Sequence, residues 1–388
     1  MKQYFKQDDT IFSITETYPE VVPILVDFGF DKLENPMIRK SIGKTMKLET
    51  ICSMRGVDLE ALMDKMNETI LKNSSTKMVI KGVLPCATRL PILSKLDDFI
   101  KSSDLDIDYT LPAASGGIEW LNEETQQEST LADIYISIGF NLFFNKSTFG
   151  QFIHDGCFSQ QTLEYNDFFS NDALGLKDKN NIYTLLGVVP AVFMVNKDLL
   201  GDRKMPTTWA EILDGSFEKQ IALPIKDLDL FNAMLLGIYT KFGEDGVKTL
   251  GKGAIKSMHP SEMAKNASHN QIPLISIAPY FFATMASRNG NTEVVWPEDG
   301  AILSPIFMIA KANRQKELQP IIDFFRSQEI GITLSGNGTF PSTAKGIDNE
   351  LLHDKKVLFP GFDFLNRTDL STLLPQLEDL YYQRREAL

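Results

Sequence analysis

An apolar run marks the point where the composition of the chain changes, Met78-Val79-Ile80-Lys81-Gly82-Val83-Leu84, and it ends at Pro85. A short run of this kind, rich in β-branched residues and closed by a proline, is typical of a buried strand. Helical spacing follows over residues 92–100, and strand-like segments follow at 107–111 and 132–137. Strands that alternate with helices predict an α/β fold, with a sheet of parallel character and helices on its faces.

The carboxyl ends of such strands are where α/β proteins gather their ligands. The sequence places small and polar residues at three of these ends. We predict that they line a ligand site: Pro85, Cys86 and Ala87 after the first strand, Ser115, Gly116 and Gly117 after the second, and Ser137 and Gly139 at the third.

Two of these positions keep alternative interpretations. Ser115-Gly116-Gly117 would let backbone N–H groups at a helix start approach an anion, or it is a turn that merely begins a helix. Arg89 would add positive charge, or it lies on a solvated helix face. Cys86 contacts the ligand or is a small buried residue, since strand position alone does not lower a thiol pKa.

The first 72 residues predict a small helical domain. One helix begins at Pro19 and stops at Gly29, a second ends at Gly56, and a third is capped by Asp58. Proline in the first turn, glycine after the last residue and aspartate at the N-cap are the usual helix boundary signals. The polar residues 73–77 are expected to form a linker.

Charge and cysteine content exclude several functions. The net charge is −12 and no Lys/Arg-rich run occurs, so nucleic acid is not expected as a partner. The three cysteines are odd in number and far apart, which argues against a disulfide scaffold or a four-thiolate zinc site. We find no zinc-protease motif, nucleophile elbow or phosphate loop, and therefore expect no enzyme.

The polar start of the chain, Met1-Lys2-Gln3-Tyr4-Phe5-Lys6-Gln7-Asp8-Asp9, does not read as a secretory signal. No segment has 18 uninterrupted apolar residues, so no membrane insertion is expected. We therefore predict a cytoplasmic protein, with an extracytoplasmic location as the alternative.

From about residue 183 the chain resembles the iron-type branch of the extracellular solute-binding proteins of ABC importers. The likeness rests on segments that follow one another at family spacing: Val188-Val189-Pro190-Ala191-Val192-Phe193 through Leu200, Pro206-Thr207-Thr208-Trp209-Ala210-Glu211-Ile212-Leu213-Asp214, Val294-Val295-Trp296-Pro297 through Phe307, Ile321-Ile322-Asp323-Phe324-Phe325 through Glu329, and Phe340-Pro341.

This resemblance implies a two-lobed, type II periplasmic-binding-protein fold that closes over a small molecule or ion. Lobe I would comprise residues 78–182 and 303–345, and lobe II residues 183–302 and 346–388, joined by crossover segments at 183–195 and 301–310. The resemblance also implies that lobe II loops contribute to the ligand site through Asp227, His259, Pro279 and Tyr280.

Ferric ion is the ligand that the resemblance suggests first. Members of the family that hold it commonly use two adjacent tyrosines, because phenolate is a hard donor. Here Tyr280 is followed by Phe281 and Phe282. Tyr280 is therefore interpreted as a hydrogen-bonding or stacking residue. His259 is a ligand contact or a loop residue, and His154 with Cys157 supplies only two local ligands. No metal or cofactor is assigned.

The N-terminal domain resembles DUF1858, a small helical domain of unknown function found beside redox and sensor modules in anaerobes. Tyr18-Pro19-Glu20, Phe28-Gly29-Phe30 and Gly56-Val57-Asp58-Leu59 carry the likeness. Many members place cysteines just after the Gly-Phe pair, where this chain has Asp31-Lys32-Leu33-Glu34. The resemblance implies a protein partner for this domain.

Three functions remain open from the sequence. The first is a cytoplasmic sensor that binds a small anion or metal complex and signals through the N-terminal domain. The second is the substrate-binding component of an ABC importer. The third is an enzyme on the same fold, since a fold does not fix a function.

Overall fold

The computed structural model describes residues 3–74, 77–118, 120–121, 128–159, 164–171, 174–224, 229–267, 273–288, 290–337 and 339–386. The chain divides into two compact units. The helical unit comprises Met1–Met78 with Asp104–Asp108, and the α/β unit comprises Val79–Ser103 with Tyr109–Leu388.

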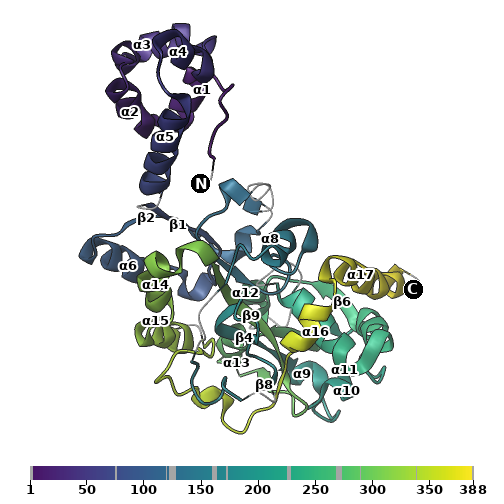
Figure 1. Ribbon diagram of the computed structural model, residues 1–388. Coiled ribbons are helices and arrows are strands. Elements are labelled where there is room, and N and C mark those ends of the chain that lie inside the picture. The colour runs from purple at the N-terminus through teal and green to yellow at the C-terminus, as the bar shows by residue number, and fades with distance from the viewer. Residues whose placement is uncertain are drawn as a thin grey trace. The chain divides into compact units, whose positions relative to one another are not determined.

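The helical unit holds five short α-helices (Figure 1): α1 Ile11–Thr17, α2 Val22–Asp27, α3 Pro36–Ser41, α4 Leu48–Arg55 and α5 Leu59–Ser74. The predicted signals at Gly29, Gly56 and Asp58 are confirmed, whereas Pro19 opens a 3₁₀ turn, Pro19–Val21, and α2 begins only at Val22. Gly29 and Gly56 take φ values of +90° and +67°, which only glycine adopts at low cost. Asp58 Oδ1 accepts hydrogen bonds from the backbone N–H groups of Glu60 and Ala61 at 3.0 and 3.1 Å.

The core of the helical unit is formed by the inward faces of these helices. Leu25, Leu48, Leu62 and Met66 are fully buried at its centre. Because α5 continues to Ser74, the helix takes up part of the stretch that the sequence assigned to a linker.

Replacing Asp58 by alanine is expected to destabilise this unit. The substitution removes the acceptor for two N–H groups at the start of α5, and loss of such an N-cap costs about 1 kcal/mol. Urea unfolding followed by circular dichroism should show a lower free energy of unfolding for Asp58→Ala. The exposed Asp64→Ala, in the middle of the same helix, should change it by less than about 0.5 kcal/mol.

The α/β unit is organised by one mixed sheet. Its strands are β1 Lys77–Gly82, β2 Asp106–Thr110, β3 Ile134–Ile138, β4 Thr184–Asn196, β5 Ile221–Leu223, β6 Ala254–Ser257, β7 Ile275–Pro279, β8 Thr292–Val295, β9 Ala301–Ala310 and β10 Val357–Leu358. The main path runs β2-β1-β3-β9-β4-β7-β5-β6, and β8 and β10 pair with β4 and β9 from outside it.

Helices surround this sheet (Figure 1), and α11 and α17 lie side by side. Their bounds are α6 Cys86–Ser102, α8 Gln151–His154, α9 Lys197–Leu200, α10 Trp209–Ile212, α11 Leu230–Gly253, α12 Pro260–Ala267, α13 Tyr280–Ser287, α14 Gln315–Phe325, α15 Gln328–Ile332, α16 Phe362–Arg367 and α17 Leu370–Glu386. Within the described ranges, no helix is both long and apolar enough to cross a membrane.

The sheet consists of two parallel parts joined by antiparallel strands. β1 and β3 are parallel, and so are β5 with β6 and β5 with β7. Between these parts, β9 pairs antiparallel with both β3 and β4, and β4 pairs antiparallel with β7. The predicted parallel character is therefore confirmed for the two outer parts and for the short pair of β10 with β9, but not for the joining strands β4 and β9 with their neighbours on the main path.

The joining strands β4 and β9 are the long apolar runs that the sequence singled out as crossovers. Every residue of both strands is buried, because helices cover both faces of the sheet at this point. Both contain a proline that cannot donate a ladder hydrogen bond. Pro190 and Pro305 lie near the middle of the β4–β9 pair, opposite Leu303 and Val188.

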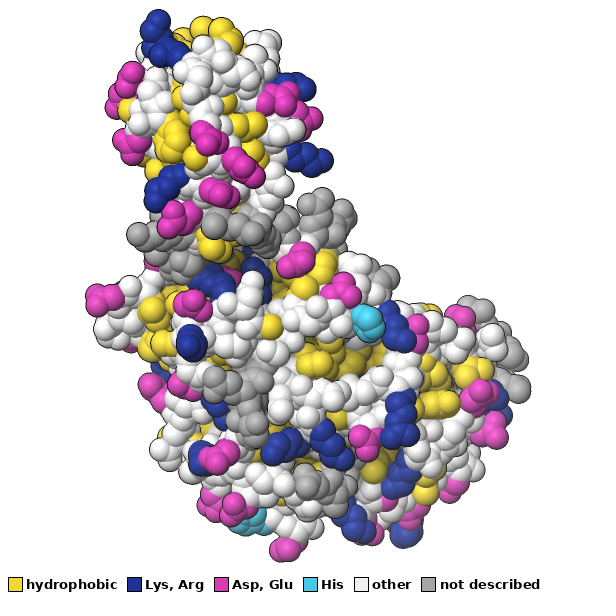
Figure 2. Space-filling view, in the orientation of Figure 1, with side chains coloured by type: hydrophobic (Ala, Val, Ile, Leu, Met, Phe, Trp, Pro, Cys, Tyr) yellow, Lys and Arg dark blue, Asp and Glu magenta, His cyan; other side chains and the backbone are white. Residues whose placement is uncertain are grey.

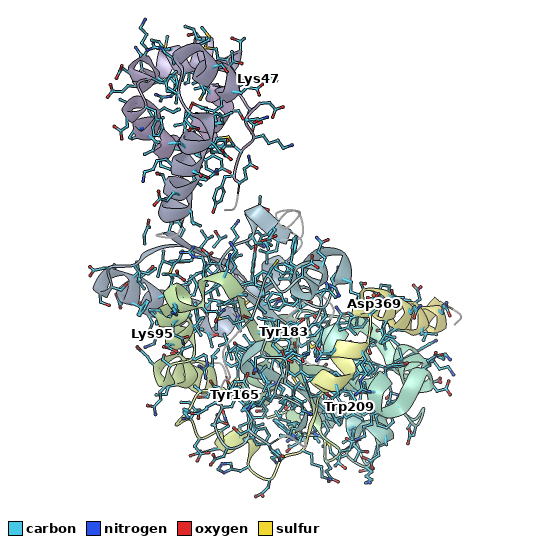
Figure 3. The ribbon with its side chains drawn as sticks, viewed as in Figure 1. Lys47, Lys95, Tyr165, Tyr183, Trp209 and Asp369 are labelled. Atoms are coloured by element: carbon cyan, nitrogen blue, oxygen red, sulfur yellow. The ribbon has the colours of Figure 1, made fainter. Side chains whose placement is uncertain are left out.

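The tryptophan motif, residues 206–214, packs the short helix α10 against the sheet. Thr208 and Glu211 form a reciprocal capping box at the start of α10. The Trp209 ring (labelled in Figure 3) is fully buried. It packs edge-on against Phe193 of β4, with ring centroids 4.8 Å apart. Its Nε1–H donates to the Gly300 carbonyl at 2.9 Å. One side chain thus ties α10 to the β8–β9 turn.

Candidate functional site

The predicted site residues after β1 and β2 come together at one edge of the sheet. Leu84 N–H donates to the Pro112 carbonyl, and Ala114 N–H donates to the Leu84 carbonyl, so both strand ends continue in parallel. Beyond them, Cys86 Sγ lies 3.3 Å from Ser115 Oγ. Two residues 29 positions apart in the sequence are therefore neighbours, as the strand-end argument requires.

Cys86 is the first residue of α6 and is exposed, whereas Pro85 before it is buried and Ala87 after it is half-buried. The interpretation of Cys86 as a small buried residue is therefore wrong. Arg89 does not extend freely into solvent, because its Nε–H donates to the Leu111 carbonyl at 2.7 Å. That bond brings a positive charge to the strand ends.

Ser115, Gly116 and Gly117 do not begin a long helix at once. Ala114–Gly116 is a single 3₁₀ turn, and Gly117 leaves it with φ of +82°. Ser115 and Gly116 are exposed and Gly117 is half-buried. The predicted N–H cradle at a helix start is thus only one turn, and Ser115 Oγ beside Cys86 Sγ is the polar group that this segment presents.

The third strand end contains the two predicted site residues Ser137 and Gly139. Ser137 is fully buried opposite Phe307, and its hydroxyl has no hydrogen-bond partner among the described residues. As a direct solute contact, Ser137 is a wrong prediction for this conformation. Gly139 has φ of +79°, and its N–H donates to the Pro305 carbonyl at 2.7 Å.

The turn after Gly139 binds a carboxylate. Asp229 Oδ2 accepts hydrogen bonds from the backbone N–H groups of Phe140 at 2.5 Å and Asn141 at 3.0 Å. Asp229 Oδ1 lies 2.5 Å from the side-chain amide nitrogen of Asn232, one turn along α11. Asp229 itself follows β5, so this carboxylate joins the strand ends of the two parallel parts of the sheet.

The electrostatics of this contact are unusual for a surface loop. Burial raises the pKa of Asp229 from 3.8 to about 6, and the N–H donors of Phe140, Asn141 and Asn232 oppose that rise. Asp229 also takes a left-handed backbone conformation, with φ of +49°. A strained residue that buries a titratable group at a junction is a marker of functional sites.

The second group of predicted residues follows β6 and β7. His259 is exposed, and its Nδ1 lies 2.6 Å from Ser261 Oγ, while its carbonyl caps the start of α12. Its ring is T-shaped to that of Phe282, with centroids 6.4 Å apart. These contacts support the interpretation of His259 as a loop residue that positions α12.

Pro279 ends β7 in a buried position opposite Ala191, and Tyr280 begins α13. The Tyr280 ring is half-buried and lies edge-on to Trp296, at 6.0 Å between centroids. This contact is edge-to-face rather than stacked, and the role of Tyr280 toward a ligand stays a prediction. Across the residues that the structure describes, no three His, Cys, Asp or Glu side chains are grouped as a metal site requires.

Two other predicted positions do not join the site. Asp227 lies outside the described residues. The His154 side chain is 90% exposed beside Asp155, whereas Cys157 is half-buried against the core. Asp229 is the residue that sequence reasoning passed over in favour of Asp227. Two aspartates in one loop gave no signal to choose between them, because the choice depends on a contact 88 or 89 residues away in sequence.

Comparison with known families confirms both resemblances. The profile of the bacterial extracellular solute-binding proteins matches residues 129–368, which is more than half of the chain. The domain of unknown function DUF1858 matches residues 5–63. No curated protein matches the sequence.

Solved structures share the fold of the α/β unit. The substrate-binding protein of an ABC transporter from Agrobacterium tumefaciens aligns with a TM-score of 0.55 and 18% identity, over 80% of this chain and 96% of that one. A ferric-binding protein from Campylobacter jejuni aligns at 0.56 and 13%, over 79% and 99%. A two-component system protein that mediates signal transduction aligns at 0.58 and 15%, over 77% and 99%.

These neighbours have the two-lobed, type II binding-protein fold, and the matched family binds solutes rather than converting them. The mixed sheet, its two parallel parts and the joining strands β4 and β9 are this architecture. The chain belongs to the bacterial extracellular solute-binding protein family and carries an N-terminal DUF1858 domain.

Proposed function

We propose that this protein is the solute-binding component of an ABC importer and captures a small anion, or a metal–anion complex, between two closing lobes. The observation that carries the proposal is the Asp229 carboxylate, held by the N–H groups of Phe140 and Asn141. A turn that binds one carboxylate oxygen with two backbone donors has the geometry to bind the oxygen of an anionic solute.

The proposed lobe boundaries follow the strands. Lobe I would comprise residues 78–182 and 303–345, and lobe II residues 183–302 and 346–388. With these bounds β9 crosses the boundary at residues 302–303. It pairs with β4, which begins directly after the other boundary at residues 182–183, and this supports hinge bending at these two strands. A solute that contacts both lobes would shift the equilibrium towards the closed form by its preference for that form.

The proposed solute-contact residues belong to the loops at the strand ends. On lobe I these are Cys86, Ser115 and the turn at Gly139, and on lobe II they are Asp227, Tyr280 and His259. Pro85, Ala87, Gly116, Gly117 and Pro279 would shape the walls. A single phenol at Tyr280 favours an anion or a preformed complex over a bare ferric ion.

Ligand screening tests this proposal. The purified full chain would be examined by native mass spectrometry with metal analysis, then by thermal shift with phosphate, sulfate, bicarbonate, citrate and ferric citrate. We expect one of these anions to raise the melting temperature with a saturating concentration dependence. A stoichiometric ferric ion bound without an anion would contradict the solute class, and no response to any probe would contradict solute binding.

The pH dependence of Asp229 gives a second test. Because burial raises its pKa from 3.8 to about 6, its contribution to stability is complete below pH 3.8 and is lost as the pH rises to about 6. The free energy of unfolding of the wild type, minus that of Asp229→Asn, should therefore fall by on the order of 2 kcal/mol between pH 4 and 7. Urea unfolding of both proteins across this range measures the difference. Parallel profiles would contradict the raised pKa of Asp229.

The family and its neighbours place solute-binding proteins outside the cytoplasm, which supports an extracytoplasmic location for an importer component. A cytoplasmic sensor is the second candidate, and the N-terminal DUF1858 domain favours it, because importer function does not require a helical unit before the binding fold. Fractionation of native cells, with the protein detected by antibody, separates the two candidates.

A further inference from the structure

The helical unit has an apolar pocket that its own helices leave open. The pocket has a volume of about 210 Å³ and lies between α3, α4 and the short turns that precede each of them. Its lining residues are Phe30, Lys32, Leu33, Ile38, Ile42, Met46, Ile51, Met54 and Arg55. We refer to this surface, together with Met37 on α3, as the α3–α4 groove.

Large apolar side chains of the α3–α4 groove are exposed to water, which is unfavourable for such side chains. Met37 is 74% exposed, Ile42 52% and Met54 69%. All three belong to a stretch of only 18 residues, positions 37–54. Apolar side chains that gather around a concavity mark an interaction site, in contrast to single exposed ones scattered over a surface.

The charge of the groove is opposite to that of the chain. Residues 31–55 carry six basic and three acidic side chains, whereas the whole chain has a net charge of −12. Lys32 and Arg55 line the pocket itself, and Lys47 stands at the start of α4 (Figure 3). Figure 2 shows apolar side chains at the surface of this unit, with both Lys or Arg and Asp or Glu side chains near them.

We propose that the α3–α4 groove is a docking site for an acidic amphipathic helix of a partner protein, which inserts one bulky apolar side chain into the pocket. A helix of this kind meets both properties of the groove, since its apolar face covers the exposed methionines and its acidic face reaches the basic rim. Unbranched methionine side chains adapt to such a helix, as they do on other helix-binding surfaces.

The size of the pocket favours a side chain of a partner helix over a free small molecule. Sites for free small molecules usually enclose about 300–1,000 Å³, so a volume of about 210 Å³ suits one anchoring side chain better. A membrane surface has no side chain to fill a concavity. In a two-fold contact with a second copy of the chain, the two identical basic grooves would face each other. Their like charges would repel, which disfavours this occupant.

Fluorescence polarisation with a synthetic probe tests the proposal on the full chain. The probe is a labelled helical peptide with leucines and one tryptophan on one face and glutamates on the other. A second peptide has lysines in place of the glutamates, and a third has the acidic sequence scrambled. Anionic vesicles of phosphatidylglycerol and phosphatidylcholine form a separate arm, and sedimentation velocity measures self-association.

Met54→Asp and the double variant Lys32→Glu, Arg55→Glu remove the apolar and the basic parts of the groove. All three side chains are exposed, so neither variant disturbs the core. Leu90→Asp, 70% exposed on α6 of the other unit, is the matched control. Circular dichroism of each variant confirms that α1–α5 remain folded.

We expect the acidic peptide to bind at least tenfold more tightly than the lysine and scrambled peptides. Met54→Asp and the double variant should each weaken it by about tenfold or more, and Leu90→Asp should leave it unchanged. Added salt should weaken binding to the wild type. Equal binding of all three peptides, or none, would overturn the proposal. Vesicle binding or self-association that Met54→Asp abolishes, without selective peptide binding, would assign the groove to a membrane or a second copy instead.

Discussion

Gly139→Ala is expected to lower the affinity for the solute by about a hundredfold or more, which is about 3 kcal/mol. An added Cβ at Gly139 would collide with the Asp229 side chain, and the φ of +79° is itself strained for alanine. The turn at residues 139–141 and the start of α11 would therefore be held apart. Isothermal titration with the anion that gives the largest thermal shift measures the loss.

Gly215→Ala is the control for backbone strain alone. Gly215 also has a positive φ, +92°, but an added Cβ there meets nothing within 4 Å. Its solute affinity should match that of the wild type. If both variants bound the solute equally well, the Gly139–Asp229 contact would have no part in binding.

Asp133→Ala is expected to destabilise the α/β unit by about 3–5 kcal/mol, because it removes a buried carboxylate that pairs with two half-buried cations. The Asp133 side chain is only 5% exposed and contacts Lys311 Nζ at 3.3 Å and Arg314 at 3.0 Å. It also accepts the Val79 N–H at 2.9 Å and so fixes the start of β1 beside β3. Calorimetry should show a melting temperature lower by on the order of 10 °C.

Asp98→Ala provides the comparison for Asp133. Asp98 also pairs with a lysine, Lys101, but its side chain is 76% exposed and the contact is 3.8 Å long. Exposed pairs contribute between about 0 and 1 kcal/mol, so its melting temperature should barely change. Equal losses in the two variants would show that burial does not set the strength of these pairs.

The sequence predicted the elements of the fold well because their signals are local. β4 and β9 were recognised as apolar crossover strands, and they span Thr184–Asn196 and Ala301–Ala310. Glycines with positive φ ended the helices of the N-terminal unit where expected. The antiparallel pairing of β9 with β3 and β4 was not predicted, since strand direction depends on contacts between distant segments rather than on residue patterns.

In the candidate site, too, local patterns could be predicted from the sequence and contacts between distant segments could not. The neighbourhood of Cys86 and Ser115 followed from the rule for strand ends, because both strands run parallel. The contact between the turn at Gly139 and Asp229 could not be predicted from that rule. Whether Asp227 or Asp229 reaches across depends on the left-handed conformation of Asp229, and aspartate adopts that conformation only where the surrounding structure imposes it.

Hinge closure at β4 and β9 changes the distance between the lobes, and that distance can be measured. Spin labels would be attached to non-canonical amino acids at Leu90 on α6 and Met285 on α13, both exposed, so that Cys86 at the proposed site is kept. Double electron–electron resonance then gives the distance distribution of the wild type and of Gly139→Ala. We expect the wild type to have a population of molecules with a short distance between the labels, and a bound anion should increase this population. In Gly139→Ala the short distance should be absent or longer by several ångströms. One identical distribution in both proteins, with and without phosphate, citrate or ferric citrate, would contradict hinge closure at β4 and β9.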